Sequence, residues 1–341
     1  MPKSWKKNWM KSKTPGTNLL EPYRETALDI AAKLRASKRV LIGTHEHPDG
    51  DALGSTLALL HVLAIQGKQV TAYIPDSPPD FFSFLPAFEK LTTQKPDVAS
   101  FDTVVLLDYT QLYRTHLEAE AKAHPNTIAI DHHHDNLQET NIHLIVPEAA
   151  ATAQILYELF QDTNTPITKD VATCLLTGIF TDTGSFMHDS VTPDILEIAS
   201  FLMGRGARLS HIAHETYQKK NLAALHIWGR AFSRIMLSKE TGAATSIITY
   251  KDLQECGATL DDLSGAVNML NTLPDTKFAM LLVEFEPGKI KGSLRSEPQK
   301  GTDVSKIAHR LGGGGHVLAA GFEVPGTFVQ QDGKWHINPT I

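Results

Sequence analysis

The chain has 341 residues, of which 42% are apolar and 21% are charged, and its formal net charge is -6. This length exceeds what one ordinary hydrophobic core serves, so we expect two domains. Proteins that coat long nucleic acid are strongly basic, and this chain is not, so we expect no binding to long duplexes.

Cysteine content and hydropathy indicate a cytoplasmic protein. Cys174 and Cys256 are the two cysteines, and neither belongs to a CxxC pair. No apolar run approaches the roughly 20 residues that cross a bilayer, and the N-terminus lacks the apolar core of a secretion signal. We therefore expect no membrane attachment.

Residues 1-22 form a basic segment. Lysines alternate with tryptophans at its start, at Lys3, Trp5, Lys6, Lys7, Trp9, Lys11 and Lys13. Such a pattern suits contact with RNA phosphates and bases, but chain ends are usually poorly ordered. We predict a basic tail here.

Short apolar runs alternate with helical patterns from residue 39 onward, which is typical of βαβ units and a parallel sheet. We predict strands at 39–44, 69–74, 103–107, 127–130 and 142–146. Helices are predicted at 53–66, 151–161, 170–180 and 193–204. The sequence thus predicts an α/β fold with a parallel-sheet domain over 23-206.

The C-terminal part of the chain predicts a second, smaller mixed α/β domain over 239-341. Strand patterns at 245–250, 278–286 and 289–296 flank a helical stretch near 260–270. An amphipathic segment within 207-238 predicts a helical linker, and a site shared by the two domains would lie in the cleft between them. Gly204 and Gly206 are either hinge points or the end of a helix.

The segment THEHPDGDALGS lies between the first strand and the following helix, where open α/β sheets place ligand sites. It contains His45, Asp49 and Asp51, whose carboxylates and imidazole can point into one space. Asp49 and Asp51 also suit a turn and a helix N-cap, so this segment alone leaves both interpretations open.

Three further strand or helix ends carry ligand-type residues. They are Asp108, the run 131–134 and Asp182. If these ends share one edge of the sheet, their carboxylates would repel one another unless cations lay between them. The number of candidate ligands is larger than the four that one tetrahedral zinc ion binds, so the sequence predicts a site for two divalent cations.

Two features of the C-terminal domain suit phosphate binding. The run LGGGGH offers backbone N–H groups with no Cβ in the way, although a flexible loop is the alternative. Arg295 ends an alternating strand, and its planar guanidinium suits phosphate unless it is an ordinary exposed arginine.

Six motifs in this order resemble the DHH phosphoesterase family with a DHH-associated C-terminal domain, in its nanoRNase (oligoribonuclease and pAp phosphatase) branch. They are HEHPDGDALGS, LLD ending at Asp108, IDHH ending at His133, TDTGSF around Asp182, GSLRS at 292–296 and GGGGH at 312–316. The resemblance spans most of the chain.

The resemblance implies a ligand set for each of two metals, with Asp108 bridging them. One metal is expected on His45, Asp49 and Asp108, and the other on Asp51, Asp108, His132 and Asp182. His133 is expected to face the scissile phosphate, and Asp131 to orient a ligand. The family usually uses Mn²⁺, which suits carboxylates and imidazoles, with Mg²⁺ or Co²⁺ as alternatives.

The resemblance also implies substrate-binding residues. These are Arg114, Arg295, Ser296, Gly314, Gly315 and His316. A surface ion pair is an alternative role for Arg114. His47 replaces a common asparagine of the family, and the family fixes no residue type at His134, so neither receives a role.

The implied function is hydrolysis of oligoribonucleotides of about two to five nucleotides to nucleoside 5′-monophosphates, and of pAp to AMP, by metal-activated water. One alternative is a phosphodiesterase for linear or cyclic dinucleotides. Another is a pyrophosphatase or exopolyphosphatase, and the GGGGH motif argues against this second alternative. A non-enzymatic nucleotide-binding regulator is disfavoured because every expected ligand position holds Asp or His. A homodimer is left open as the assembly state.

Overall fold

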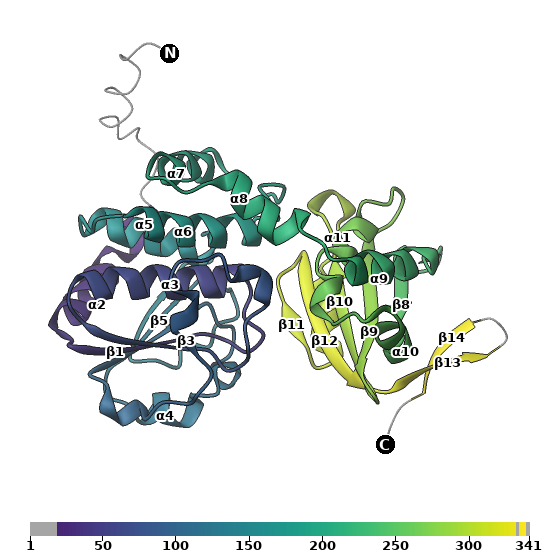
Figure 1. The fold of residues 1–341 in the computed structure, drawn as a ribbon, viewed down its shortest axis with the longest axis horizontal. Helices are drawn as coiled ribbons and strands as arrows, with labels where there is room; N and C mark the ends of the chain where they lie inside the picture. Colours follow the sequence, from purple (N-terminus) through teal and green to yellow (C-terminus); the bar gives the residue numbers. More distant parts are fainter. Residues whose placement is uncertain (1–18, 332–333, 339–341) are drawn as a thin grey trace, which may run out of the picture. The chain divides into compact units, whose positions relative to one another are not determined.

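A computed structural model describes residues 19–331 and 334–338 of the chain. The chain divides into two compact units, Met1–Thr216 and Tyr217–Ile341 (Figure 1). The boundary falls within the segment that the sequence suggests as a linker. Residues 1–18 of the expected basic tail lie outside the described residues.

A six-stranded parallel sheet forms the centre of the first unit, with strand order β3-β2-β1-β4-β5-β6. Its strands are β1 (Arg39–Gly43), β2 (Gln69–Tyr73), β3 (Leu91–Thr92), β4 (Thr103–Leu107), β5 (Thr127–Asp131) and β6 (Ile142–Ile145). Every residue of β4 and β5 is buried, as expected for strands covered on both faces. The predicted α/β class is confirmed.

Helices cover both faces of this sheet. The helices of this unit are α2 (Arg24–Ala36), α3 (Gly50–Ile65), α4 (Glu118–Ala123), α5 (Thr152–Asp162), α6 (Lys169–Asp182), α7 (Pro193–Gly204) and α8 (Leu209–Ala213), of which α7 and α8 pack on α6. Figure 1 shows α3 on one side of the sheet and α4 on the other. The four helices predicted for this unit are all present as α3, α5, α6 and α7.

Two glycines allow α3 and α6 to pack closely. A Cβ on Gly54 would lie 2.5 Å from the carbonyl oxygen of Cys174, and one on Gly178 would lie 2.5 Å from Oδ1 of Asp51. Neither distance is sterically tolerable, so larger residues would force the helices apart. The close approach brings the start of α3 next to α6.

The segment after α7 differs from the single amphipathic helix expected near 211–238. Gly206 has φ +108°, a value typical of the glycine just past a helix end, so its conformation matches the helix-end interpretation. After α8 a π-helical turn at His214–Gln218 follows, and α9 (Leu222–Ser233) begins separately. The Asn221 side chain accepts the N–H of Ala224 at 2.6 Å and so starts the new helix.

The second unit contains a six-stranded mixed sheet in the order β11-β12-β10-β9-β8-β7. Its strands are β7 (Met236–Leu237), β8 (Ala243–Ile248), β9 (Phe278–Glu286), β10 (Lys289–Arg295), β11 (Gly314–Gly315) and β12 (Ala319–Pro325). β8 and β9 are parallel, and the other neighbours are antiparallel. A separate hairpin consists of β13 (Thr327–Gln331) and β14 (Lys334–Asn338). The predicted mixed α/β unit is confirmed.

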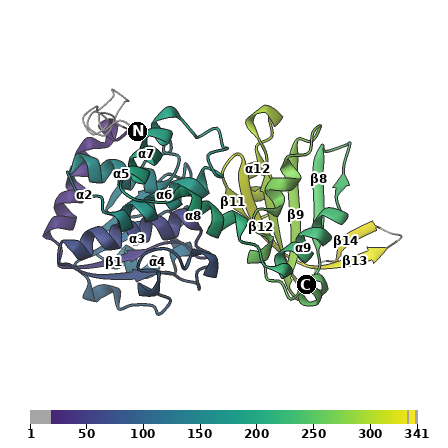
Figure 2. The same ribbon diagram turned by 45° about the horizontal axis from the view of Figure 1, so that its top comes forward.

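Alternate residues of β9 face two different cores. Leu281 and Val283 pack with Ile227 of α9, whereas Met280 and Leu282 pack with the core that contains α12 (Val304–Arg310). Figure 2 shows both helices beside the strands of this unit. The remaining helices are α10 (Tyr250–Cys256) and α11 (Ala266–Asn271).

The helix expected near 260–270 is shorter than predicted. A 3-10 turn at Asp261–Leu263 comes first, and Gly265, with φ +88°, separates this turn from α11. Across the described part of the chain, no helix combines the length and apolar character that crossing a membrane requires.

Candidate metal centre

The loop between β1 and α3 is organised by Asp49. Its Oδ1 accepts the N–H groups of Asp51 and Ala52, each at 3.0 Å, so Asp49 is the N-cap of α3. The cap uses one carboxylate oxygen and leaves Oδ2 outside it. The alternative interpretation gives Asp49 a turn and Asp51 the N-cap, whereas the structure makes Asp49 the N-cap and places Asp51 in the first turn of α3. Because Oδ2 lies outside the cap, this structural role of Asp49 is compatible with a ligand role.

Asp51 is buried in the first turn of α3 and bonds to the start of α5. Oδ2 accepts the N–H of Thr152 at 2.6 Å, and Oδ1 accepts the N–H of Ala153 at 3.0 Å. Burial, together with the charges of Asp182 and Asp49, raises the pKa of Asp51 well above its ordinary value. The carboxylate thus lies in a site that disfavours its negative charge.

Asp108 follows directly after β4 and lies between two histidines. Its Oδ2 is 3.9 Å from Nε2 of His45, and its Oδ1 is 3.6 Å from Nε2 of His132. Its backbone has φ +54°, which is rare for a residue other than glycine and turns the chain sharply at the end of the strand. Burial and the charge of Asp51 raise the pKa of Asp108 well above its ordinary value.

The ring orientation of these two histidines is set by backbone carbonyls. Nδ1 of His45 lies 2.6 Å from the carbonyl oxygen of Glu46, and Nδ1 of His132 lies 3.2 Å from that of Ala149. A carbonyl accepts only, so each Nδ1 carries the proton. Burial lowers the pKa of His45, so its ring is neutral at neutral pH. Its Nε2 then directs a lone pair at Oδ2 of Asp108, and Nε2 of His132 faces the other oxygen of the same carboxylate.

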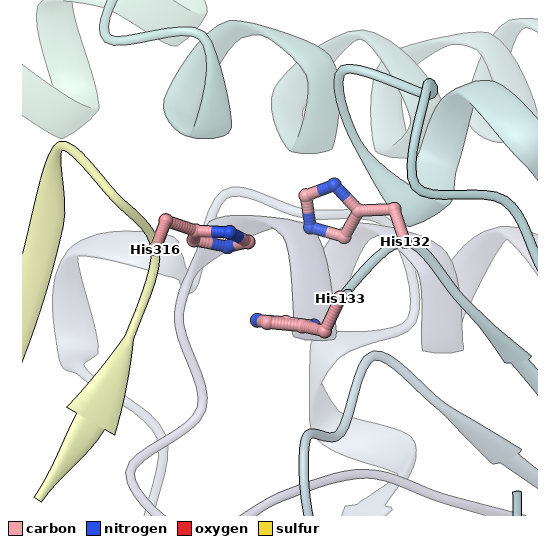
Figure 3. Close-up of side chains that lie close together, drawn as sticks. All are labelled: His132, His133 and His316. Atoms are coloured by element: carbon pink, nitrogen blue, oxygen red, sulfur yellow. The ribbon is translucent and has the colours of Figure 1, made fainter. Parts of the chain in front are cut away.

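His133 differs from His132 although the two are adjacent. Figure 3 shows both rings on the same side of the loop after β5, and their centroids are 4.8 Å apart. Nδ1 of His133 donates to Oδ1 of Asp131 at 2.7 Å. Burial opposes protonation of His133, but the charge and hydrogen bond of Asp131 outweigh it and raise the pKa of His133 to about 9.

Asp131 is fully buried at the end of β5 and is held by three donors. It accepts the N–H of His132 at 2.8 Å, the ring of His133, and the side-chain amide of Asn136 at 2.8 Å. This carboxylate therefore fixes the loop that carries both histidines.

Ligand-type atoms gather in three groups within the first unit. In each group the atoms lie within 4.8 Å of one another, and the groups are His45, Asp49 and Asp108; Asp51, His132 and Asp182; and Asp108, Asp131 and His133. The first two groups fit a pair of divalent cations, because each combines an imidazole nitrogen with carboxylate oxygens, and both are donors that such cations bind. Partial burial also raises the pKa of Asp182.

The neighbouring loop residues have other partners. Nε of Arg114 lies 3.5 Å from Oε1 of Glu46, so the ion pair considered as its alternative role is present. His47 bonds to Asp76 through its N–H at 2.8 Å and its ring at 3.1 Å. His134 is exposed. Sequence reasoning missed Thr152, Asn136 and Glu46, because none belongs to a recognisable ligand motif.

The expected substrate-binding residues of the second unit share one end of its sheet. Arg295 pairs with Ala319 in the register of β12, and Gly315 pairs with Ala320. Ser296 is buried, and its hydroxyl donates to the carbonyl of Lys277 at 2.9 Å. His316 follows β11 directly and donates its N–H to Ala319 at 2.8 Å.

The glycine run forms a strand rather than a flexible loop. Gly314–Gly315 make up β11, which pairs with Gly321 and Ala320 of β12. A Cβ on Gly313 would lie 2.1 Å from the carbonyl oxygen of Gly321, and Gly315 has φ +130°. Both positions therefore require glycine.

Comparison with known proteins identifies the class to which this fold and this cluster belong. The model of the DHH family N-terminal domain matches residues 39–179, and the model of the DHHA1 domain matches residues 244–332. The chain belongs to the DHH phosphoesterase family, with a C-terminal DHHA1 domain.

Its relatives include two proteins named as nucleases. The bifunctional oligoribonuclease and PAP phosphatase NrnA of Thermus thermophilus is 32% identical over 316 residues, covering 92% of this chain and 93% of the relative. A probable bifunctional oligoribonuclease and PAP phosphatase NrnA of Streptococcus mutans is 26% identical over 295 residues, covering 86% of this chain and 91% of the relative.

A similar solved structure is that of an exopolyphosphatase-related protein from Bacteroides fragilis. It has a TM-score of 0.81 and 26% sequence identity, and the match covers 88% of this chain and 91% of that one. The fold described above is therefore shared over nearly the full length of both chains.

Proposed function

We propose that this protein hydrolyses short oligoribonucleotides to nucleoside 5′-monophosphates, and pAp to AMP, with two divalent cations. One observation supports this above the others: His45 and His132 direct Nε2 at opposite oxygens of Asp108. A bridging carboxylate between two cations needs this arrangement. The substrate class is that named for the relatives in Thermus thermophilus and Streptococcus mutans.

The cations would be held by nitrogen and oxygen donors alone. One set is His45, Asp49 and Asp108, and the other is Asp51, Asp108, His132 and Asp182. A donor set without thiolate suits Mn²⁺, which we propose, and also Mg²⁺ or Co²⁺. When bound, such cations lower the pKa of water and stabilise negative charge on phosphate.

His133 and Asp131 would act on the phosphate without holding a cation. Nδ1 of His133 bonds to Asp131, so we propose that this ring would contact phosphate through Nε2. A protonated His133 would donate from Nε2 to a phosphoryl oxygen as negative charge grows there. Asp131 would keep the ring protonated and in this orientation.

The second unit would bind the part of the substrate that is not cleaved. We propose this role for Arg295, Ser296, Gly314, Gly315 and His316. Arg114 would contact a phosphate near its ion pair with Glu46. On this proposal, 23–206 is the catalytic domain, 207–238 a linker and 239–341 the substrate-binding domain.

The cellular setting is part of the proposal. Two free cysteines, Cys174 and Cys256, support a reducing cytoplasm. Partners would be short RNA and small nucleotides, without long duplexes, and a homodimer is compatible with this function.

The alternative function is cleavage of phosphoanhydrides, as in a pyrophosphatase or exopolyphosphatase. It is favoured by the Bacteroides fragilis structure, which is described as exopolyphosphatase-related. The test is Mn²⁺-dependent hydrolysis of a labelled RNA series from dimer to long oligomer, with pAp and pyrophosphate in parallel. Preference for the shortest RNAs with AMP release from pAp supports the proposal, and pyrophosphate cleavage with inert RNA contradicts it.

Two aspartates at opposite ends of β4 provide a matched pair of variants for this assay. Asp108 follows the strand, and Asp102 precedes it by one residue and bonds to the N–H groups of Lys38 and Arg39. Asp108→Ala is expected to abolish turnover, whereas Asp102→Ala retains it. Activity of Asp108→Ala within tenfold of the wild type would contradict the proposed role of Asp108.

A further inference from the structure

Helix α5 begins against the candidate metal centre without a capping side chain of its own. Ala151 is its N-cap residue and makes no side-chain cap. The first N–H groups of the helix bond instead to Asp51, with Thr152 at 2.6 Å and Ala153 at 3.0 Å. Asp51 thus caps a helix that lies 101 residues further along the chain.

Thr152 also contacts the second central carboxylate. Its side chain is fully buried, and its hydroxyl donates to Oδ1 of Asp108 at 3.0 Å. One residue therefore bonds to Asp51 through its backbone and to Asp108 through its side chain. Those two carboxylates come from different elements, α3 and the end of β4.

The hydroxyl bond fixes the rotation of the Asp108 carboxylate. Oδ1 accepts from Thr152 and lies on the side of His132, so Oδ2 is left on the side of His45. Each oxygen has a second lone pair for another partner. Without the hydroxyl, the charges of neighbouring Asp51 would favour rotation of this carboxylate away from it.

We infer that Thr152 is a positioning residue for the two-cation site: its hydroxyl orients Asp108, and its N–H, at the positive end of α5, orients Asp51. The helix dipole and the N–H donors stabilise negative charge at Asp51, which burial otherwise disfavours. This inference rests on the proposed function, because it takes Asp51 and Asp108 as cation ligands.

The competing explanation is that Thr152 only begins a helix and fills space. Valine has nearly the same shape and keeps the backbone N–H, so Thr152→Val removes the hydroxyl bond alone. Thr152→Ser keeps the hydroxyl and serves as the rescue variant. A structural role predicts a lower melting temperature for Thr152→Val with unchanged cation binding.

A matched control is Thr103→Val. Thr103 is also buried, and it begins the strand that ends before Asp108. Its hydroxyl bonds to that of Ser37 at 2.7 Å, and Ser37 keeps a second bond to the carbonyl of Lys33. The control thus makes the same threonine-to-valine change in the same unit, but at the end of β4 away from Asp108.

The experiment is a calorimetric titration of Mn²⁺ into the metal-free full chain without substrate. We expect Thr152→Val to bind Mn²⁺ at least tenfold more weakly than the wild type, as for other groups that orient metal ligands. Thr152→Ser and Thr103→Val should bind within threefold of the wild type. The Mn²⁺ concentration for half-maximal activity should rise in Thr152→Val, with kcat largely restored at saturating Mn²⁺.

The outcomes separate this inference from the proposed function. Equal Mn²⁺ affinity of Thr152→Val and the wild type would overturn the positioning role alone. A loss of similar size in Thr103→Val would overturn it too, because the effect would then reflect any buried threonine. A wild type that binds no Mn²⁺ would overturn the proposed function, and the inference with it.

Discussion

His133 donates a hydrogen bond from Nδ1 to Oδ1 of Asp131, at 2.7 Å, and Asp131 has no exposure to solvent. A buried carboxylate paired in this way keeps the adjacent imidazole protonated across the neutral range. The ring of His133 therefore carries a positive charge beside a cluster of carboxylates, independently of bound cations, while the pair as a whole is neutral.

This pair predicts the titration of metal-free protein. The pKa of His133 should be about 9, above the ordinary 6.5, and Asp131→Asn should lower it. Because the pKa is raised in the folded state, the stability that the pair contributes is fully present below pH 6.5 and is lost as the pH rises through about 9. Histidine ring NMR in a chelating buffer measures the first effect, and a pKa of 6.5 or below for His133 would contradict it.

The carboxylate cluster predicts that Asp108→Asn stabilises the metal-free protein. Burial and nearby charges raise the pKa of Asp108, so its ionised form costs stability at neutral pH, and a neutral amide removes that cost. The melting temperature in chelating buffer should therefore rise while activity is lost.

Asp102→Asn is the control for this stabilisation. Backbone N–H groups of Arg39 and Lys38 lower the pKa of Asp102, so its charge is favourable and its removal should give no gain. If both variants melted at or below the wild-type temperature, repulsion within the cluster would not be a determinant of stability.

Gly178→Ala is predicted to disturb both packing and the candidate site. The added methyl would meet Oδ1 of Asp51 at 2.5 Å and Cβ of Ala153 at 2.7 Å. Overpacking of this kind costs about 2 kcal/mol, and we expect weaker Mn²⁺ binding as well. Denaturant unfolding and Mn²⁺ titration measure the two effects.

Gly204→Ala is the matched variant for Gly178→Ala. Gly204 ends α7 in the same unit, and nothing lies within 4 Å of an added Cβ. This variant should be as stable as the wild type or more so. Equal stability of Gly178→Ala and Gly204→Ala would show that α6 moves without cost.

In the second unit, Asp252 joins α9 to α10. The nearly buried carboxylate accepts from Arg230 at 2.7 Å and from Arg234, and it also bonds to the N–H of Thr249 at 2.9 Å. Asp252→Ala removes these bonds together, and a hydrogen bond to a charged group contributes about 2 kcal/mol, so the variant should destabilise this unit.

The pH dependence of that effect follows from the pKa of Asp252. Burial opposes its charge, but the bonds from Arg234 and Thr249 outweigh burial and lower its pKa far below the ordinary 3.8. A lowered pKa gives stability that is present above pH 3.8 and is lost as the pH falls toward the folded-state value. The difference in free energy of unfolding between the wild type and Asp252→Ala, measured in urea, should thus become smaller in acid. A difference that stays constant with pH would contradict this account.

Much of the fold could be predicted because local patterns determine it. The runs TVVLL and TIAI are continuously apolar, and they form β4 and β5 on the buried centre of the sheet. Asp108 and Asp131 end or follow those strands, so parallel topology alone brings them to one edge. The amphipathic pattern of Pro193–Gly204 likewise defines α7.

Other features depend on contacts between distant residues and could not be predicted. Thr152 lies in an ordinary helical pattern, and its role arises only because α3 and β4 meet α5. The break before α9 depends on the single cap at Asn221, within a pattern that reads as continuous. The φ of +54° at Asp108 could not be predicted either, because most aspartates have a negative φ and nothing in the local sequence marks this one as an exception.

The bond between Asp51 and the start of α5 has a consequence for protein synthesis. A nascent chain that has left the ribosome only through β5 carries Asp51 and Asp108 but lacks the N–H groups that hold Asp51. Long-range contacts of this kind form late in folding. The group of Asp51, His132 and Asp182 therefore cannot assemble until α5 and α6 have emerged, so the growing polypeptide lacks a complete two-cation centre until that point of its translation.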